Sequence, residues 1–197
     1  MIRLPPTVPG LAVGLFGGSF DPPHAGHAHV ARTALRRAGL DRVWWLPTPG
    51  NPLKEVAGLP PLAERTAAAR TLAHHPRMVV SDLESRLGTR YTIDLVRRLP
   101  PMRPGVRFVL VIGADNWATI HRWGRWREIC ERLPVVVVDR PGATLKALSS
   151  PAARLYAARR LPERAARRLA ATPAPAWVFL TGRRSPLSST ALRKREG

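Results

Sequence analysis

Cysteine and long apolar runs are scarce in this chain of 197 residues. Cys130 is the single cysteine, which excludes an internal disulfide, and we expect it to be a packed thiol. No apolar run is long enough to span a bilayer, and the proline-rich start, residues 1–10, lacks the apolar centre of a signal peptide. These absences favour a cytoplasmic protein with no membrane role.

Acidic residues are also few, with 13 Asp and Glu against 32 Lys and Arg, so that the formal net charge is +19. A charge of this size suits a basic nucleic-acid-binding module. However, only three of the cations are lysines, and the arginines are scattered over helix-like stretches without interleaved aromatics. An arginine-rich solvated surface is therefore favoured, with no specific nucleic-acid partner. Such a surface still attracts anionic substrates.

Short apolar runs alternate with helix-like segments along the whole chain. The runs are continuous, which is typical of strands buried on both faces. The alternation predicts one α/β domain over residues 1–197, built on a doubly wound parallel sheet of Rossmann-like type. Ligands bind such sheets at the carboxyl ends of the strands. We expect strands at 11–16, 43–47, 78–81, 106–112, 135–139 and 177–181, and helices at 25–38, 62–73, 93–99, 126–132, 151–169 and 189–195.

A glycine turn, Gly17-Gly18, separates the first strand from a helix that starts near two histidines. Glycine lets the backbone approach phosphate closely, and a helix start offers unpaired N–H groups and the positive end of the dipole. His24 and His27 are three residues apart, so both imidazoles face one side of the helix. Such a pair can bring positive charge to a phosphoryl-transfer transition state.

Other interpretations of this turn fit less well. The glycine spacing does not match G-x-G-x-x-G, and no Gly-Lys-Ser/Thr follows. His-x-x-His can bind zinc, but no glutamate lies beside these histidines as in H-E-x-x-H. Two structural histidines remain the alternative to a phosphate site.

A second phosphate-binding pattern lies near the end of the chain. Ser188, Ser189 and Thr190 begin a predicted helix at about 188–195, where hydroxyls and free N–H groups can hold phosphate. Arg193 lies one turn after Ser189 and can face the same anion. A simple serine cap on a terminal helix is the alternative.

Polar and aromatic residues follow the other predicted strands, each with a structural alternative. Lys54 could reach a triphosphate or be a surface lysine, and Arg140 could lie near a nucleotide or in a solvated turn. Asp115 suits ribose hydroxyls, although it and Thr92 could each cap a helix. Trp123 and Trp126 could stack on a ligand ring or belong to the core.

These motifs together resemble the H-x-G-H nucleotidyltransferases, and most closely the nicotinate-nucleotide adenylyltransferase family. The resemblance is carried by G-G-S-F-D-P-P-H-A-G-H at 17–27 and by L-S-S-T-A-L-R at 187–193, where the family has I-S-S-T-x-I-R. The family's Ser-Tyr-Thr appears here with Arg90 in place of serine, before Tyr91 and Thr92. The implied reaction joins ATP and nicotinate mononucleotide to give deamido-NAD and pyrophosphate. Nicotinamide mononucleotide or another phosphorylated acceptor is the nearest alternative.

The resemblance also implies roles for individual residues. Mg²⁺ would bind mainly through ATP, with no protein metal site, and the partners would be the two small-molecule substrates. The implied catalytic residues are His24, His27 and Arg193; those for ATP are Gly17, Gly18, Ser19, Phe20, Lys54, Asp115, Ser188, Ser189 and Thr190; those for the nicotinate nucleotide are Thr92, Trp123 and Arg140, with Trp126 left to the core.

Overall fold

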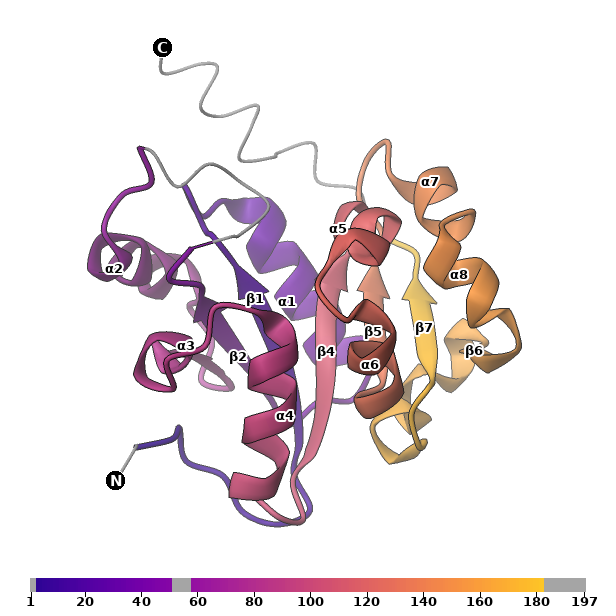
Figure 1. The fold of residues 1–197 in the computed structure, drawn as a ribbon, viewed down its shortest axis with the longest axis horizontal. Helices are drawn as coiled ribbons and strands as arrows, with labels where there is room; N and C mark the ends of the chain where they lie inside the picture. The colour runs from indigo at the N-terminus through magenta and orange to yellow at the C-terminus, as the bar shows by residue number, and fades with distance from the viewer. Residues whose placement is uncertain (1–2, 51–57, 183–197) are drawn as a thin grey trace.

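The architecture is a parallel sheet between two layers of helices (Figure 1). The structure, a computed structural model, describes residues 3–50 and 58–182. In these residues seven strands pair in the order β3-β2-β1-β4-β5-β7-β6, and every pair is parallel. The predicted doubly wound α/β sheet is therefore confirmed. The strands are β1 (Ala12–Gly18), β2 (Arg42–Pro47), β3 (Met78–Val80), β4 (Arg107–Gly113), β5 (Val135–Val138), β6 (Arg160–Leu161) and β7 (Trp177–Leu180).

Burial on both faces explains the continuous apolar strands. Adjacent side chains of a strand point to opposite faces, and Trp44 and Trp45 of β2 belong to two separate apolar clusters. Both indoles are fully buried. A strand of this kind needs large apolar residues at successive positions, which is the pattern in the sequence.

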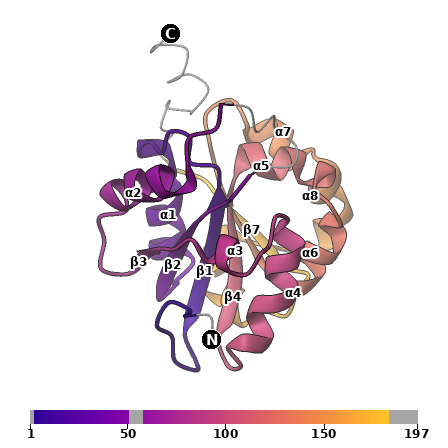
Figure 2. The same ribbon diagram turned by 60° about the vertical axis from the view of Figure 1, so that its left-hand side comes forward.

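Each face of the sheet has its own helical layer (Figures 1 and 2). One layer holds α1 (Ala25–Arg37), α2 (Leu62–Leu72) and the 3₁₀ segment η3 (Glu163–Ala171). The other layer holds the remaining helices, whose buried side chains belong to the apolar cluster that contains Trp117. Its elements are α3 (Leu83–Arg86), α4 (Thr92–Met102), α5 (Ala114–Thr119), η1 (Ile120–Arg122), α6 (Trp126–Arg132), α7 (Thr144–Leu148) and α8 (Pro151–Leu155), with η2 (Ala157–Arg159) after them.

The expected helix at 151–169 is wrong. The chain there forms α8, η2, the two-residue strand β6 and then η3. Pro162 lies inside the expected span, and a proline within a helix removes a hydrogen bond and clashes with the preceding turn. The short helices α3, α5 and α7 were not expected, because four to six residues are too few to show helical periodicity. The helix expected at 189–195 lies outside the described residues.

Cys130 is a packed thiol, as predicted. It lies on α6 with 2% of its surface exposed, and burial raises the pKa of the thiol to about 12. Trp126 on the same helix also belongs to the core. None of the described helices is long and apolar enough to cross a membrane.

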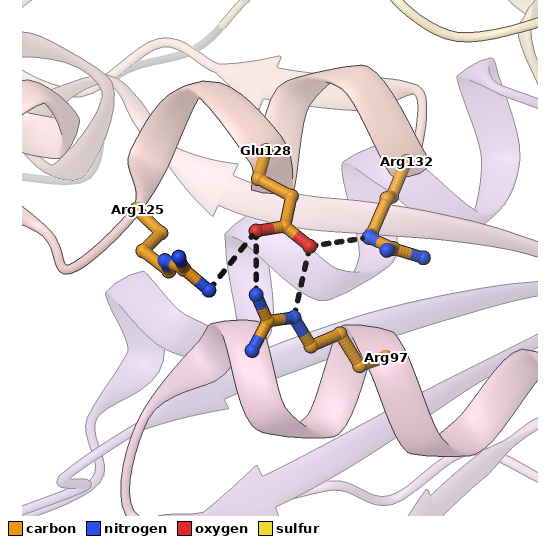
Figure 3. A network of polar contacts seen from close by, with 4 residues as sticks. All are labelled: Arg97, Arg125, Glu128 and Arg132. Atoms are coloured by element: carbon orange, nitrogen blue, oxygen red, sulfur yellow. Dashed lines mark hydrogen bonds and ion pairs between the residues drawn. The ribbon is translucent and has the colours of Figure 1, made fainter.

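An arginine cluster on the outer surface joins α4 to α6 (Figure 3). Arg97 of α4 donates two hydrogen bonds of 2.8 Å to the two carboxylate oxygens of Glu128 on α6. Arg132 donates a third at 2.8 Å, and Arg125 lies 3.8 Å away. The hydrogen bonds from Arg97 and Arg132 lower the pKa of Glu128 to about 2. We call this group the Glu128 cluster.

Candidate functional site

The sheet changes its direction of growth between β1 and β4. Strands β2 and β3 extend it on one side, and β5 and β7 extend it on the other. In open parallel sheets, ligands bind beyond the carboxyl ends of the strands at this switch point. A cavity of about 250 Å³ lies there, lined by residues after β1, β2, β4 and β5 and by the loop before α4. We call it the switch-point cavity.

Two histidines form the start of α1 and also line this cavity. His24 is the N-cap residue, and its Nδ1 accepts a hydrogen bond of 3.0 Å from the Gly26 N–H. His27 Nδ1 accepts one of 3.2 Å from the His24 N–H. The two rings lie 3.9 Å apart. Since each Nδ1 is an acceptor, the hydrogen of each neutral imidazole is on Nε2.

His24 is neutral at pH 7 in the free protein. Burial, reinforced by the nearby Arg140, lowers the pKa of His24 to about 4 against the opposite effect of Asp115. The positive charge expected on this ring is therefore absent without substrate. The buried Nε2 of His24 has no hydrogen-bond partner among the described residues. A buried donor of this kind is normally satisfied, so the atom suits a ligand acceptor.

Phe20 packs against His27 and does not line the cavity. Its φ of 48° is left-handed, which is unusual for a bulky residue and is held in place by packing. The ring is 1% exposed, stacks on Trp45 at 5.3 Å and meets His27 edge-on at 5.0 Å. The resemblance places Phe20 among the ATP contacts, and in the structure its ring lies in the core against His27.

The segments after β4 and β5 bring an acidic and a basic side chain together at the cavity. Asp115, on the first turn of α5, has its Oδ1 3.8 Å from Arg140 Nε. A side chain at Gly113 would put Cβ 2.4 Å from that carboxylate oxygen and 2.8 Å from Arg140 Cδ. Glycine is thus required for both side chains to keep these positions. Asp139 fixes the turn, because its carboxylate accepts from the Arg140 N–H at 2.9 Å and the Thr144 hydroxyl at 2.6 Å.

The loop before α4 and Trp123 also line the cavity. Arg90, Tyr91 and Thr92 line the cavity together with the half-buried Trp123. The interpretation of Thr92 as an N-cap is wrong by one position, since Tyr91 is the N-cap and Thr92 is the first helical residue. Asp115 is likewise not a cap, because Gly113 holds that position before α5.

Two buried charged residues that the sequence analysis did not assign complete the structure around the cavity. Glu84 of α3 lines it with 5% exposure, and burial raises the pKa of its carboxyl to about 7. Arg65 of α2 is 3% exposed and does not line the cavity. Its guanidinium donates to Ser19 O at 2.6 Å, Thr48 O at 3.0 Å and Pro60 O at 2.9 Å. Arg65 thereby fixes the loops after β1 and β2 to each other.

Comparison with known proteins agrees with this geometry. A family model described as Cytidylyltransferase-like matches residues 15–195. A "Probable nicotinate-nucleotide adenylyltransferase" of Methylorubrum extorquens is 56% identical over 185 residues, which are 94% of this chain and 100% of the relative. One of the same name from Cereibacter sphaeroides is 56% identical over 93% of this chain and 96% of its own. The chain belongs to the cytidylyltransferase-like family, among its nicotinate-nucleotide adenylyltransferases.

Solved structures show the same fold for this adenylyltransferase family member at much lower identity. The Plasmodium falciparum nicotinic acid mononucleotide adenylyltransferase complexed with NaAD has a TM-score of 0.69. It is 16% identical and covers 93% of this chain, which covers 83% of it. A structure from Vibrio parahaemolyticus, a putative nicotinate-nucleotide adenylyltransferase by its description, has a TM-score of 0.52 at 24% identity. It covers 64% of this chain, which covers 76% of it.

The cavity of this family member unites most of the site residues predicted from the sequence. They come from segments that lie far apart in the chain and meet at one edge of the sheet. Those that line the cavity are Gly17, Gly18, Ser19, His24, His27, Thr92, Asp115, Trp123 and Arg140. Lys54, Ser188, Ser189, Thr190 and Arg193 lie outside the described residues.

Glu84 and Arg65 gave little signal in the sequence. Each stands in a helix-like stretch among other charged residues, where a solvated side chain is the normal interpretation. Their burial follows from packing between loops that are distant in the chain. Glu84 follows the strand predicted at 78–81, and this position was the one indication in the sequence that it lies near the site.

Proposed function

We propose that this chain transfers the adenylyl group of ATP to nicotinate mononucleotide, giving deamido-NAD and pyrophosphate. The observation that carries the proposal is the switch-point cavity, which has paired imidazoles on one wall and a tryptophan and an arginine on another. The first wall suits phosphates, and the second suits a flat, anionic pyridine nucleotide. The names of the relatives at 56% identity support the same reaction.

The chemistry needs no protein nucleophile. A phosphate oxygen of nicotinate mononucleotide attacks the α-phosphorus of ATP, and the bond from that phosphorus to the bridging oxygen breaks in line. Pyrophosphate leaves with the electron pair of the broken bond. Positioning and charge stabilisation are then the main contributions of the protein.

The imidazoles would act as hydrogen-bond donors to the ATP phosphates. Their Nδ1 atoms are held by backbone N–H groups, so both Nε2–H groups are fixed in direction before substrate arrives. Preorganised donors of this kind stabilise charge that develops in the transition state. A bound triphosphate would also raise the pKa of His24, since nearby negative charge favours the imidazolium.

The remaining phosphate contacts are proposed for residues outside the described part of the chain. Ser188, Ser189, Thr190 and Arg193 would hold the β- and γ-phosphates, and Lys54 would reach the triphosphate. The family match through residue 195 supports this assignment. We also retain the proposal that residues 1–197 are one domain with a phosphate-binding helix at about 188–195.

The acceptor would occupy the wall formed by the loop before α4. The Trp123 indole can stack on the cationic pyridine ring, with Thr92 and Arg140 at the same cavity. Arg90 adds a positive charge to this wall. A guanidinium favours the carboxylate of nicotinate over the neutral amide of nicotinamide. This charge is the specific feature that favours the acid.

Mg²⁺ would accompany the triphosphate. Among the described residues no group of three or more His, Cys, Asp or Glu could hold a metal ion. Asp115 and Glu84 are the carboxyl groups among the described residues that line the cavity, and Mg²⁺ bound through substrate phosphates often needs just one or two carboxylate ligands. When bound, the ion would neutralise phosphate charge, while the protein residues orient the nucleotide. We further propose a cytoplasmic location, with small molecules rather than nucleic acid as the partners.

The test is pyrophosphate release by the purified chain with ATP and Mg²⁺ and a panel of acceptors. We expect the highest kcat/KM with nicotinate mononucleotide, a lower value with nicotinamide mononucleotide and none with phosphopantetheine. A higher value with the amide would contradict the choice of acceptor. Salt-sensitive binding to RNA or DNA without pyrophosphate release would instead favour the basic nucleic-acid-binding module.

A further inference from the structure

Glu84 is a buried carboxyl in the cavity wall for which the proposed reaction has no use. It lies on α3, after β3, at 5% exposure. Its Oε1 faces the glycine turn, since a Cβ on Gly17 would lie 3.7 Å away. Its backbone carbonyl accepts from both the N–H and the hydroxyl of Thr89, at 2.9 and 3.1 Å. The residue is therefore fixed between the loop after β1 and the loop before α4.

The hydrogen bonds of Thr48 distinguish the two protonation states of this carboxyl. The Thr48 and Glu84 side chains are hydrogen-bonded to each other, and the Thr48 hydroxyl also donates to Gly50 O at 3.0 Å. A hydroxyl has one hydrogen to donate. If Glu84 is neutral, its O–H donates to Thr48, which donates in turn to Gly50. If Glu84 is charged, it competes with Gly50 for the Thr48 hydrogen.

Among the residues that the structure describes, none forms an ion pair with Glu84 that would hold it in the charged form. Burial alone raises the pKa of Glu84, and the Thr48 hydrogen bond is the one opposing cause. Arg86 pairs with Asp82 at 2.8 Å, and Arg65 donates to the backbone carbonyls of Ser19 and Thr48. The elements around Glu84 and the cavity carry other charged and titratable groups. They include Asp82 and Arg86 beside or on α3, Arg90 and Tyr91 in the next loop, Asp94 and Arg98 on α4, Arg65 on α2, His24 and His27 at α1, and Asp115 and Arg140 after β4 and β5.

We propose that Glu84 is a positioning residue that acts in its protonated form, donating to Thr48 and so holding the Thr48–Gly50 corner beside the glycine turn. Loss of the proton redirects the Thr48 hydroxyl away from Gly50 O. It also places a negative charge in a cavity that, under the proposed function, must admit two anionic substrates. Ionisation of Glu84 therefore weakens substrate binding as well as the corner.

Glu84→Gln is the variant that separates this role from a structural one, because its amide can still donate to Thr48 but cannot ionise. We expect wild-type kcat/KM for nicotinate mononucleotide to fall above a pH of about 7, through a rise in KM. The ratio of wild-type to E84Q kcat/KM should fall by about tenfold from pH 6.5 to pH 8.5. Glu84→Leu, which lacks a donor, should be impaired at every pH. Glu64→Gln, on the exposed side of α2, is the matched control and should follow the wild-type profile.

The substrate phosphate also titrates, but it does so in both the wild type and E84Q, so the ratio of the two isolates Glu84. A constant ratio across this range would overturn the proposal. So would a folded E84Q variant that is inactive at every pH, because a charged carboxylate would then be required.

A measurement without catalysis keeps this proposal distinct from the proposed function. In the full wild-type chain labelled with ¹³C-glutamate, the carboxyl resonance absent from E84Q should titrate near pH 7. In a uniformly ¹³C-labelled chain, the Gly50 carbonyl shift should follow the same midpoint, since that carbonyl loses the Thr48 bond. A midpoint below pH 5.5 would overturn the proposal even if the enzyme transfers adenylyl groups. Titration near pH 7 in a chain without adenylyltransferase activity would support the positioning role and refute the reaction.

Discussion

Two glutamates in this molecule have opposite environments. Glu128 lies between three arginines on the outer surface of α4 and α6 (Figure 3), whereas Glu84 lies in the switch-point cavity with a threonine as its side-chain partner. Hydrogen bonds from arginine lower the pKa of Glu128 to about 2, and burial raises that of Glu84 to about 7. The Glu128 carboxyl is thus charged at neutral pH, whereas the Glu84 carboxyl changes its protonation state near pH 7.

These shifts give opposite dependences of stability on pH. The folded-state pKa of Glu84 is raised, so its contribution is complete below the ordinary value of 4.5 and is lost as pH rises through about 7. The folded-state pKa of Glu128 is depressed, so its contribution is present above 4.5 and is lost as pH falls through about 2. The difference teaches that burial and hydrogen-bond partners, rather than residue type, decide the protonation of a carboxyl in this fold.

If catalysis takes place in the switch-point cavity and the Glu128 cluster only stabilises the surface, substitutions in the cavity should lower turnover far more than substitutions in the cluster. The largest effect is expected for His27→Ala. Loss of one preorganised donor lowers kcat by about 10²–10³-fold, and the His24 N–H also loses its acceptor. Steady-state kinetics check this, with the exposed His74→Ala as control. Near-normal kcat in the His27 variant would exclude its role.

Gly113→Ala should have the next largest effect. The new methyl group would meet the Asp115 carboxylate and the Arg140 side chain, which must both move. A displacement of about 1 Å in a site can cost about 10–10²-fold in kcat/KM. Gly182→Ala, whose Cβ would meet its nearest neighbour at an ordinary 3.7 Å, is the control. Unchanged kinetics for the Gly113 variant would show that the close approach is unimportant.

Trp123→Ala should distinguish binding of nicotinate mononucleotide from binding of ATP. We expect KM for nicotinate mononucleotide to rise by about tenfold, because stacking on a cationic ring is worth about 1–2 kcal/mol. KM for ATP should change much less. Initial-rate measurements with each substrate varied in turn decide the matter. An equal rise in both KM values would refute stacking on the pyridine ring.

Arg90→Ser, which restores the serine of the resembled family, should reduce the preference for the acid over the amide. An exposed charge interaction predicts a loss of about 2–5-fold in the ratio of kcat/KM values for the two mononucleotides. Arg90→Lys keeps the charge and should retain most of the preference. If the serine variant discriminates as well as the wild type, backbone groups must make the choice.

Glu128→Gln is expected to have the smallest effect. Exposed ion pairs contribute little to stability, so Tm at pH 7 should fall by about 2 °C or less, and kinetics should not change. The gap in Tm should close as pH falls toward 2, because the wild-type carboxylate is then protonated. Thermal unfolding across pH measures this. A large loss of activity would remove the distinction between the two regions.

The sequence predicted the sheet well because its signals are local. Each expected strand ends within two residues of the observed one at its carboxyl end, and the glycine turn and histidines lie where the pattern put them. The two-residue β6 and the broken segment around Pro162 carry too few residues to show a period. Glu84 and Arg65 could not be assigned for a different reason. Their roles depend on contacts between distant loops, which no local pattern encodes.

Both imidazoles at the start of α1 accept hydrogen bonds from backbone N–H groups through Nδ1. Each imidazole is a structural part of the helix and also a group directed at the nucleotide. A fluctuation that opens the first helical turn would release both rings at once, so folding and readiness for reaction are joined in the same few bonds. Replacing His24 and His27 together should therefore cost less than the sum of the two single changes.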